Sequence, residues 1–175
     1  MKTNKKDLLL TGAIVIVALL TGYFLGVNNN HGLGRVTAAG KTPDNYGPRL
    51  AGRKLALDGI DWSKSQRTLV FALQAGCHFC SESGGFYQRL VQQRASFGDT
   101  RLVAVLPQGP DDARRYLGKI GFAADEIRQK SLSDIGVRGT PTLLLVDESG
   151  IITDVWDGKL SPARENNLLA RLQIK

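Results

Sequence analysis

The chain has 175 residues, of which 42% are hydrophobic, and it carries a formal net charge of +7. This length allows one domain with its own core besides short appended segments. Because the chain has only two cysteines and two histidines, one copy lacks the ligands of a usual zinc site.

A long apolar run near the N-terminus predicts a membrane anchor. Residues 8–27 contain no charged side chain, and a helix of this length, at about 1.5 Å per residue, spans roughly the 30 Å hydrocarbon core of a bilayer. Lysines lie in the preceding segment 1–7, and no basic residue follows until Arg35. The positive-inside rule therefore places 1–7 as a cytoplasmic tail and the rest of the chain across the membrane. A cleavable signal peptide is the alternative, but the first small residues suited to cleavage, Ala38 and Ala39, lie far downstream.

The rest of the chain divides into a tether and one domain. Residues 28–54 are rich in Asn, Gly, Pro and Lys and show little periodicity, which indicates a tether, and residues 55–175 form the predicted domain. Segment 114–130 is its densest basic stretch. A nucleic-acid interface needs such a patch with aromatic or groove-reading residues, on a protein that meets nucleic acid. An exported domain does not meet nucleic acid, so we expect no nucleic-acid partner. We expect instead a solvated basic face, suited at most to anionic lipid or an acidic partner.

The domain alternates strands and helices, which predicts an α/β sheet with helices on both faces. Apolar runs predict the strands, and apolar residues at helical spacing predict the helices. The domain is expected to begin with a short hairpin over 55–62 that turns at Asp58-Gly59, followed by a strand over 68–73 and a helix over 81–94 that bends at Gly84-Gly85. A strand over 101–106 and a helix that opens at Pro110-Asp111 come next. The chain then continues with a strand over 142–147, a tight turn over 148–150, a strand over 151–156 and a last helix that opens at Ser161-Pro162.

Both cysteines lie directly after the first core strand. Cys77 and Cys80 form a C-x-x-C motif at the predicted start of a helix, where unpaired backbone N–H groups favour a thiolate on Cys77. One helical turn separates the two sulfurs, which can close a disulfide with modest rearrangement. The spacing therefore predicts a pair that cycles between dithiol and disulfide. In that cycle Cys77 is the nucleophile that attacks a substrate disulfide, and Cys80 resolves the mixed disulfide.

A second motif, Gly139-Thr140-Pro141-Thr142, precedes the strand predicted over 142–147. An X–Pro bond is the one place where a cis peptide costs only about 0.5–1 kcal/mol. Proline also removes an N–H, which leaves neighbouring backbone groups free to pair with an extended substrate peptide. A trans proline that simply starts an edge strand explains these residues equally well.

With these two motifs in this order of elements, residues 55–175 resemble the thioredoxin superfamily. The long segment between the motifs is similar to its TlpA-like or redoxin branch, which consists of membrane-anchored extracytoplasmic thiol–disulfide oxidoreductases. The resemblance implies a thioredoxin-like fold, with a central mixed sheet flanked by helices. It also implies a cis Pro141 against the cysteine pair, and no cofactor beyond the redox-active disulfide Cys77–Cys80.

Neighbouring residues have predicted supporting roles. His78 lies beside both sulfurs and, when protonated, would lower the pKa of the thiol; the alternative is an exposed helix residue with no special contact. Phe79 would offer an apolar rim for substrate docking, or would pack inward. Thr140 and Pro141 would bind the substrate backbone.

The sequence departs from the usual pattern of this family at several positions. Gly76 stands where typical thioredoxins have Trp, Phe79 where they have Pro, and Gly85 where many members bend the helix with proline. The strand over 69–73 also lacks the buried carboxylate that helps deprotonate the resolving thiol in many members. These departures leave the direction of electron transfer open.

Other cysteine chemistries fit the sequence less well. The peroxiredoxin signature fails at Val70 and Gln74, and haem attachment fails at Ser81, where a histidine is needed. A non-catalytic, membrane-tethered binding module with a structural disulfide is one alternative, and a metal-handling thiol dimer is another. A closed C-x-x-C loop adds little stability, which disfavours the structural disulfide.

We therefore expect a membrane-anchored thiol–disulfide oxidoreductase in the periplasm or outside the cell. The resemblance to the family implies a disulfide reductase rather than an oxidase. Its expected partners are exported proteins that carry thiols or disulfides. A membrane electron donor would reduce it again, because a tethered domain meets such a donor at high effective concentration.

Overall fold

The computed structural model describes residues 49–173. The predicted anchor over 8–27 and most of the predicted tether over 28–54 lie outside this range. Within residues 49–173, no helix is both long enough and apolar enough to cross a membrane.

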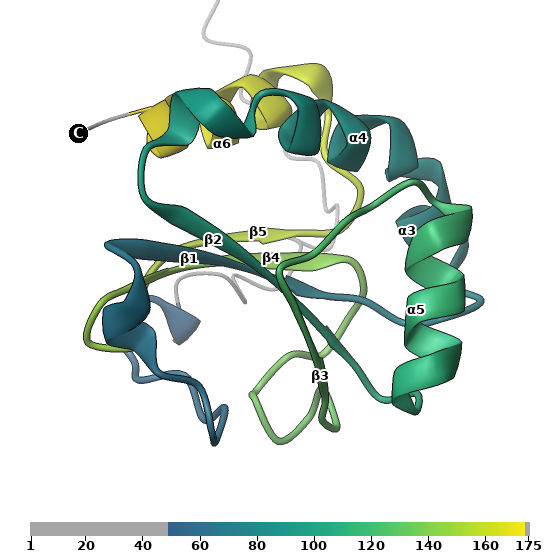
Figure 1. Ribbon diagram of the computed structural model, residues 1–175, viewed down its shortest axis with the longest axis horizontal. Helices are drawn as coiled ribbons and strands as arrows, with labels where there is room; N and C mark the ends of the chain where they lie inside the picture. The colour runs from purple at the N-terminus through teal and green to yellow at the C-terminus, as the bar shows by residue number, and fades with distance from the viewer. Residues whose placement is uncertain (1–48, 174–175) are drawn as a thin grey trace, which may run out of the picture. The chain divides into compact units, whose positions relative to one another are not determined.

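A mixed five-stranded sheet forms the centre of the described chain (Figure 1). Its strands lie in the order β3-β2-β1-β4-β5; β1, β2 and β3 are parallel, whereas β4 is antiparallel to both β1 and β5. The strands are β1 (Arg67–Ala72), β2 (Thr100–Leu106), β3 (Glu126–Gln129), β4 (Thr142–Asp147) and β5 (Ile152–Asp157). Nearly every side chain of β1, β2 and β4 is buried, since these central strands are covered on both faces.

The helices α3 to α6 cover one face of the sheet. The helices are α3 (His78–Glu82), α4 (Gly84–Gln92), α5 (Pro110–Lys119) and α6 (Pro162–Gln173), with short 3-10 helices η1 (Trp62–Lys64) and η2 (Arg94–Phe97). Leu69 and Phe71 of β1 and Leu102 of β2 join buried side chains of α3 to α6 in one core cluster. Figure 1 shows α4 and α6 over this face, where Arg89 of α4 pairs with Glu165 of α6.

Irregular segments cover the opposite face of the sheet in the described chain. Val70 and Val103 lie in this second core cluster, under apolar side chains from segments 50–60 and 132–137. Segment 50–60 begins inside the stretch that we expect to be tether. Apart from residues 49 and 50, neither segment is helical, so the prediction of helices on both faces is wrong here. Left-handed glycines interrupt both segments, at Gly52, Gly59 and Gly136.

The predicted hairpin over 55–62 is also wrong, because its two arms do not pair with each other. The first arm pairs elsewhere: the N–H of Leu55 donates to the carbonyl of Gly150 (2.9 Å), and Lys54 forms a β-bridge with Ile151. Burial of the apolar residues against the sheet therefore overrides the local hairpin signal.

The other predicted strands and helices are present, with two differences. The helix expected over 81–94 begins earlier and is interrupted at Ser83, whose Oγ donates to the carbonyl of Phe79 (2.7 Å). The interruption also suits the buried Gly84, because a Cβ there would lie 3.0 Å from the carbonyl oxygen of Ile120. The short strand β3 was not predicted, because its side chains are mostly polar and none is fully buried.

Candidate active site

The loop between β1 and α3 presents Cys77 at the start of a helix. The chain turns through Gly76, whose φ of +83° lies in the left-handed region that favours glycine. The backbone N–H of Cys77 donates to the carbonyl of Gln74 (3.1 Å), and the Sγ of Cys77 accepts from the backbone N–H of Cys80 (3.3 Å). Cys77 is thus the N-cap of α3, and its sulfur replaces the oxygen of an ordinary capping residue.

The two sulfurs differ in exposure. Cys77 is partly exposed, whereas Cys80 is fully buried in the core under α3 to α6. Both thiols are free, and the Sγ of Cys77 also donates to the carbonyl of Thr140 (3.4 Å). One sulfur can therefore meet a partner from solvent, and the other can act only within the protein.

The two thiols also differ in acidity. Desolvation raises the pKa of Cys77, but hydrogen bonds from the side chains of Cys80 and Thr140 and from backbone amides outweigh it, so the pKa is lowered overall. Burial raises the pKa of Cys80 to about 12, and the hydrogen bond with Cys77 adds to the rise. Cys77 is therefore the sulfur that ionises first.

The start of β4 brings the second motif to the cysteines. Because β4 is antiparallel to β1 and pairs Thr142 with Ala72, its beginning lies beside the end of β1. The Thr140–Pro141 peptide bond is cis, which confirms that expectation. The side chain of Pro141 is buried and Thr140 is partly exposed. From this motif, the carbonyl group of Thr140 accepts a hydrogen bond from the Sγ of Cys77.

The two residues between the cysteines face solvent. His78 is 77% exposed, and its Nε2 lies 3.2 Å from Oε1 of Glu82, which also pairs with Lys159. No hydrogen bond among residues 49–173 joins the His78 imidazole to a sulfur. Phe79 is 55% exposed, so it offers apolar surface and does not pack inward. Within the described residues, no group of three or more His, Cys, Asp or Glu side chains could hold a metal ion.

Two tyrosine hydroxyls are buried in the same core cluster as Cys80. Tyr87 of α4 is fully buried and Tyr116 of α5 is 8% exposed. Neither hydroxyl has a hydrogen-bond partner of standard geometry among residues 49–173. Burial raises the pKa of both phenols, the nearby side chains of Ser83 at Tyr87 and Ser81 at Tyr116 lower it by less, and negative charge on the sulfurs adds to the rise. Both therefore stay protonated, as hydrogen-bond donors. In the sequence they are only apolar-face positions of helices, and no spacing signals that they share a core with Cys80.

No protein-family model matches the chain, and no curated protein matches its sequence. Solved structures match it in fold. A protein from Chlorobium tepidum described as the thiol:disulfide interchange protein DsbE is 23% identical, with a TM-score of 0.51 over 64% of this chain and 83% of its own. A thiol-disulfide isomerase from Corynebacterium glutamicum is 14% identical, with a TM-score of 0.52 over 71% of this chain and 93% of its own. The peroxidoxin BcpB from Mycobacterium tuberculosis is 16% identical, with a TM-score of 0.51 over 64% of this chain and 81% of its own.

These matches join proteins named for different chemistries, which is common among proteins that share a fold. At such identities they show the architecture alone. With its mixed five-stranded sheet and its helices, the described chain has a thioredoxin-like α/β fold.

Proposed function

We propose that this chain is a thiol–disulfide oxidoreductase that acts on protein substrates through Cys77 and Cys80. The observation that carries the proposal is the asymmetry of the two sulfurs. Cys77 is partly exposed and has a lowered pKa, whereas Cys80 is buried and has a pKa of about 12. A purely structural disulfide needs no stabilised thiolate, but an exchange reaction does. The names of two matched structures, an interchange protein and an isomerase, agree with this chemistry.

The reaction proceeds in two exchange steps. In the first, the thiolate of Cys77 attacks one sulfur of a substrate disulfide; a Cys77–substrate bond forms, the substrate S–S bond breaks, and the second substrate sulfur leaves as a thiolate. In the second, the proton of Cys80 passes to the substrate thiolate released in the first step or to water, and the Cys80 sulfur attacks the Cys77 sulfur. A Cys77–Cys80 bond forms, the Cys77–substrate bond breaks, and the first substrate sulfur leaves as a thiolate. The substrate gains two electrons, and the protein is left with a Cys77–Cys80 disulfide. The reverse sequence oxidises a substrate dithiol.

The second step needs help, because burial, the largest cause of the raised pKa of Cys80, does not depend on the state of Cys77. The buried hydroxyls of Tyr87 and Tyr116 are suited to give it. Each lacks a partner of standard geometry in the reduced protein and lies in the core cluster that holds Cys80. A hydroxyl that donates to the Cys80 thiolate as it forms stabilises the negative charge on the sulfur and so favours ionisation.

The surface around Cys77 suits a polypeptide substrate. Phe79, two residues after Cys77, offers an exposed aromatic ring, and the carbonyl of the partly exposed Thr140 accepts from the Cys77 sulfur. A substrate in extended conformation beside Thr140 would place its disulfide over Cys77.

The setting of the reaction is part of the proposal. The apolar run over 8–27 supports a membrane anchor with the domain outside the cytoplasm. The substrates are then exported proteins, and a membrane electron donor returns the pair to the dithiol. The reduction potential of the pair decides the direction of transfer: a value near about −270 mV suits a reductase, and one near about −120 mV suits an oxidant.

Reduction of insulin disulfides by the full chain tests the activity. We expect turnover by the wild type, no turnover by Cys77→Ser, and a trapped mixed disulfide at Cys77 in Cys80→Ser, with the double Cys→Ser variant as the blank. Wild-type rates in both single variants, or no turnover by the wild type, would instead favour the non-catalytic binding module.

A further inference from the structure

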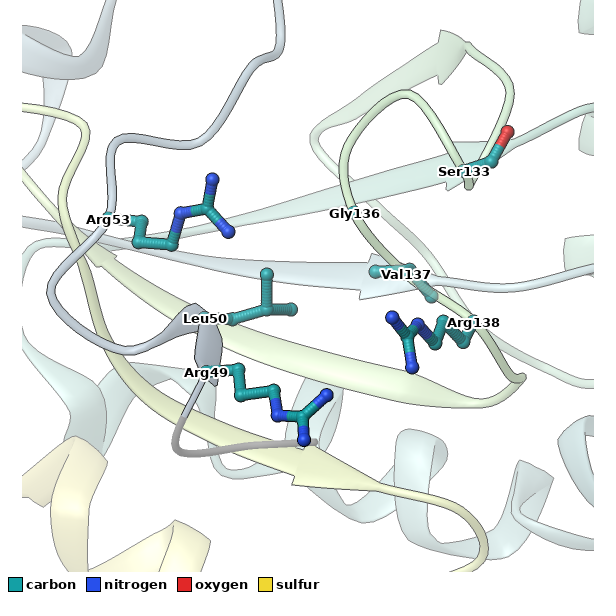
Figure 2. Close-up of a pocket in the computed structure, with 7 residues that line it drawn as sticks. All are labelled: Arg49, Leu50, Arg53, Ser133, Gly136, Val137 and Arg138. Carbon is teal, nitrogen blue, oxygen red and sulfur yellow. The ribbon is translucent and has the colours of Figure 1, made fainter. Parts of the chain in front are cut away.

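A cavity of about 500 Å³ lies on the second face of the sheet, where the start of the described chain meets the loop after β3. Figure 2 shows Arg49 and Arg53 on one side of it and Arg138 on the other, with their guanidinium groups extending into the space between the two segments. None of the described residues that line this cavity is acidic. The carboxylate of Asp134 belongs to the lining of an adjoining cavity of about 270 Å³.

Arg49 and Arg53 differ from the other arginines in residues 49–173. Carboxylates pair with Arg89, Arg94, Arg101, Arg114, Arg115, Arg128, Arg164 and Arg171, and backbone carbonyls accept from Arg67. Arg138 also has a partner of its own. Arg49 and Arg53 are the exceptions in the described chain, since no hydrogen bond or ion pair engages either side chain. Positive charges that gather around a cavity raise the local concentration of anions.

Backbone hydrogen bonds hold both walls of the cavity in place. On one wall, the N–H of Gly52 donates to the carbonyl of Ile152 in β5 (2.7 Å). On the other, the N–H of Val137 donates to the carbonyl of Leu132 (2.8 Å). The cavity is thus formed before a ligand arrives, as most small-molecule sites are.

We propose that this cavity binds the phosphate group of a small organic phosphate, through Arg49 and Arg53 with Arg138 as the third side. A phosphate offers several oxygens, so guanidinium groups from different directions can donate to it at once, which a two-oxygen carboxylate allows less well. The volume fits a small ligand. Leu50 and Val137 also line the cavity, so its lining is not charged throughout. The site does not depend on the proposed redox function.

The phosphate can come from a soluble ester or from the headgroup of a phospholipid, and binding measurements on the full chain distinguish the two. One arm titrates inorganic phosphate and glycerol 3-phosphate into the detergent-solubilised chain by calorimetry. The other places the chain in vesicles of phosphatidylglycerol or of phosphatidylcholine and follows hydrogen exchange of the amides in 49–54 and 132–138.

We expect Arg49→Gln and Arg53→Gln each to weaken binding about tenfold, because each removes a charge-assisted donor, and the double variant to weaken it about a hundredfold. The matched control is Arg114→Gln, an exposed arginine of α5 outside the cavity, which should bind as the wild type does. Thermal unfolding of each variant checks that the fold is kept.

Each outcome decides the matter. If the soluble phosphates bind the wild type and bind the double variant much more weakly, the site takes a soluble ligand. If only phosphatidylglycerol vesicles protect the amides from exchange, and the double variant loses this protection, the site takes a lipid headgroup. Absence of binding in both arms, or binding that persists in the double variant, overturns the proposal.

Discussion

The two faces of the sheet give the same strands two different electrical environments. On the face under α3 to α6, Cys80 and the hydroxyls of Tyr87 and Tyr116 are shut away from water. On the other face, irregular segments leave Arg49 and Arg53 exposed beside a cavity. Helices that pack closely can keep a thiol neutral, whereas open loops keep cations solvated and accessible. The fold thus separates chemistry that depends on burial from recognition that depends on charge.

Truncation of a core aromatic is expected to have the largest effect and to show how far the helix-covered face depends on packing. The ring of Phe71 lies 5.4 Å from that of Tyr87 and 4.3 Å from that of Phe122. Phe71→Ala should lower the free energy of unfolding by about 3–5 kcal/mol. The matched change on the other face of the same strand, Val70→Ala, should cost about 2 kcal/mol, because it removes a smaller side chain. Denaturant unfolding measures both, and equal losses would contradict the contrast.

Removal of a buried tyrosine hydroxyl tests the chemistry of the helix-covered face without a change in its packing. If Tyr116 donates to the forming Cys80 thiolate, Tyr116→Phe should slow release of the mixed disulfide about tenfold, the value of one hydrogen bond to a charged group. The ratio of the wild-type rate to the variant rate should stay constant with pH and fall only as the pH approaches the raised pKa of Cys80, where the thiolate fraction saturates. Stopped-flow release of a labelled peptide from Cys77 measures the rate. Tyr87→Phe is the parallel variant, and unchanged release in both single variants and in the double variant would exclude the tyrosines.

The central strands and the place of Cys77 at a helix start could be predicted from the sequence because both rest on local patterns. The apolar runs of β1, β2 and β4 are fully buried strands, and the C-x-x-C spacing fixes Cys77 at a helix start. The hairpin over 55–62 failed because its apolar residues are buried against a distant part of the chain. Strand β3 was missed because an edge strand with polar side chains has no periodic apolar signal.

The surroundings of Cys80 could not be predicted for a different reason. Tyr87 and Tyr116 come from two helices, and only tertiary packing brings them into the core of Cys80. The same holds for Arg49 and Arg138, which are far apart in the sequence and line one cavity. Such groupings depend on how the segments cross the sheet, which no single stretch of sequence encodes.

Two glycines near the active site should respond to the same substitution in opposite ways, with the smallest effects. Gly76→Ala should lower the free energy of unfolding by about 1 kcal/mol, because φ is +83° there and no other atom is near the new Cβ. Gly85→Ala should raise it by about 0.5–1 kcal/mol, because Gly85 is exposed within α4 and has open space around it. Thermal unfolding compares the two, and a stabilising Gly76→Ala would contradict the assigned turn.

The asymmetry of the two sulfurs is tested most directly by the pH dependence of alkylation at each cysteine in the reduced full chain. Because only a thiolate reacts, a lowered pKa moves the rise in rate to lower pH, and a raised pKa moves it to higher pH. Mass spectrometry after timed iodoacetamide pulses should show Cys77 labelled with a midpoint below that of an ordinary cysteine. Cys80 should stay unlabelled until the pH approaches about 12. Equal labelling of the two cysteines at neutral pH, or labelling of Cys80 first, would contradict the account.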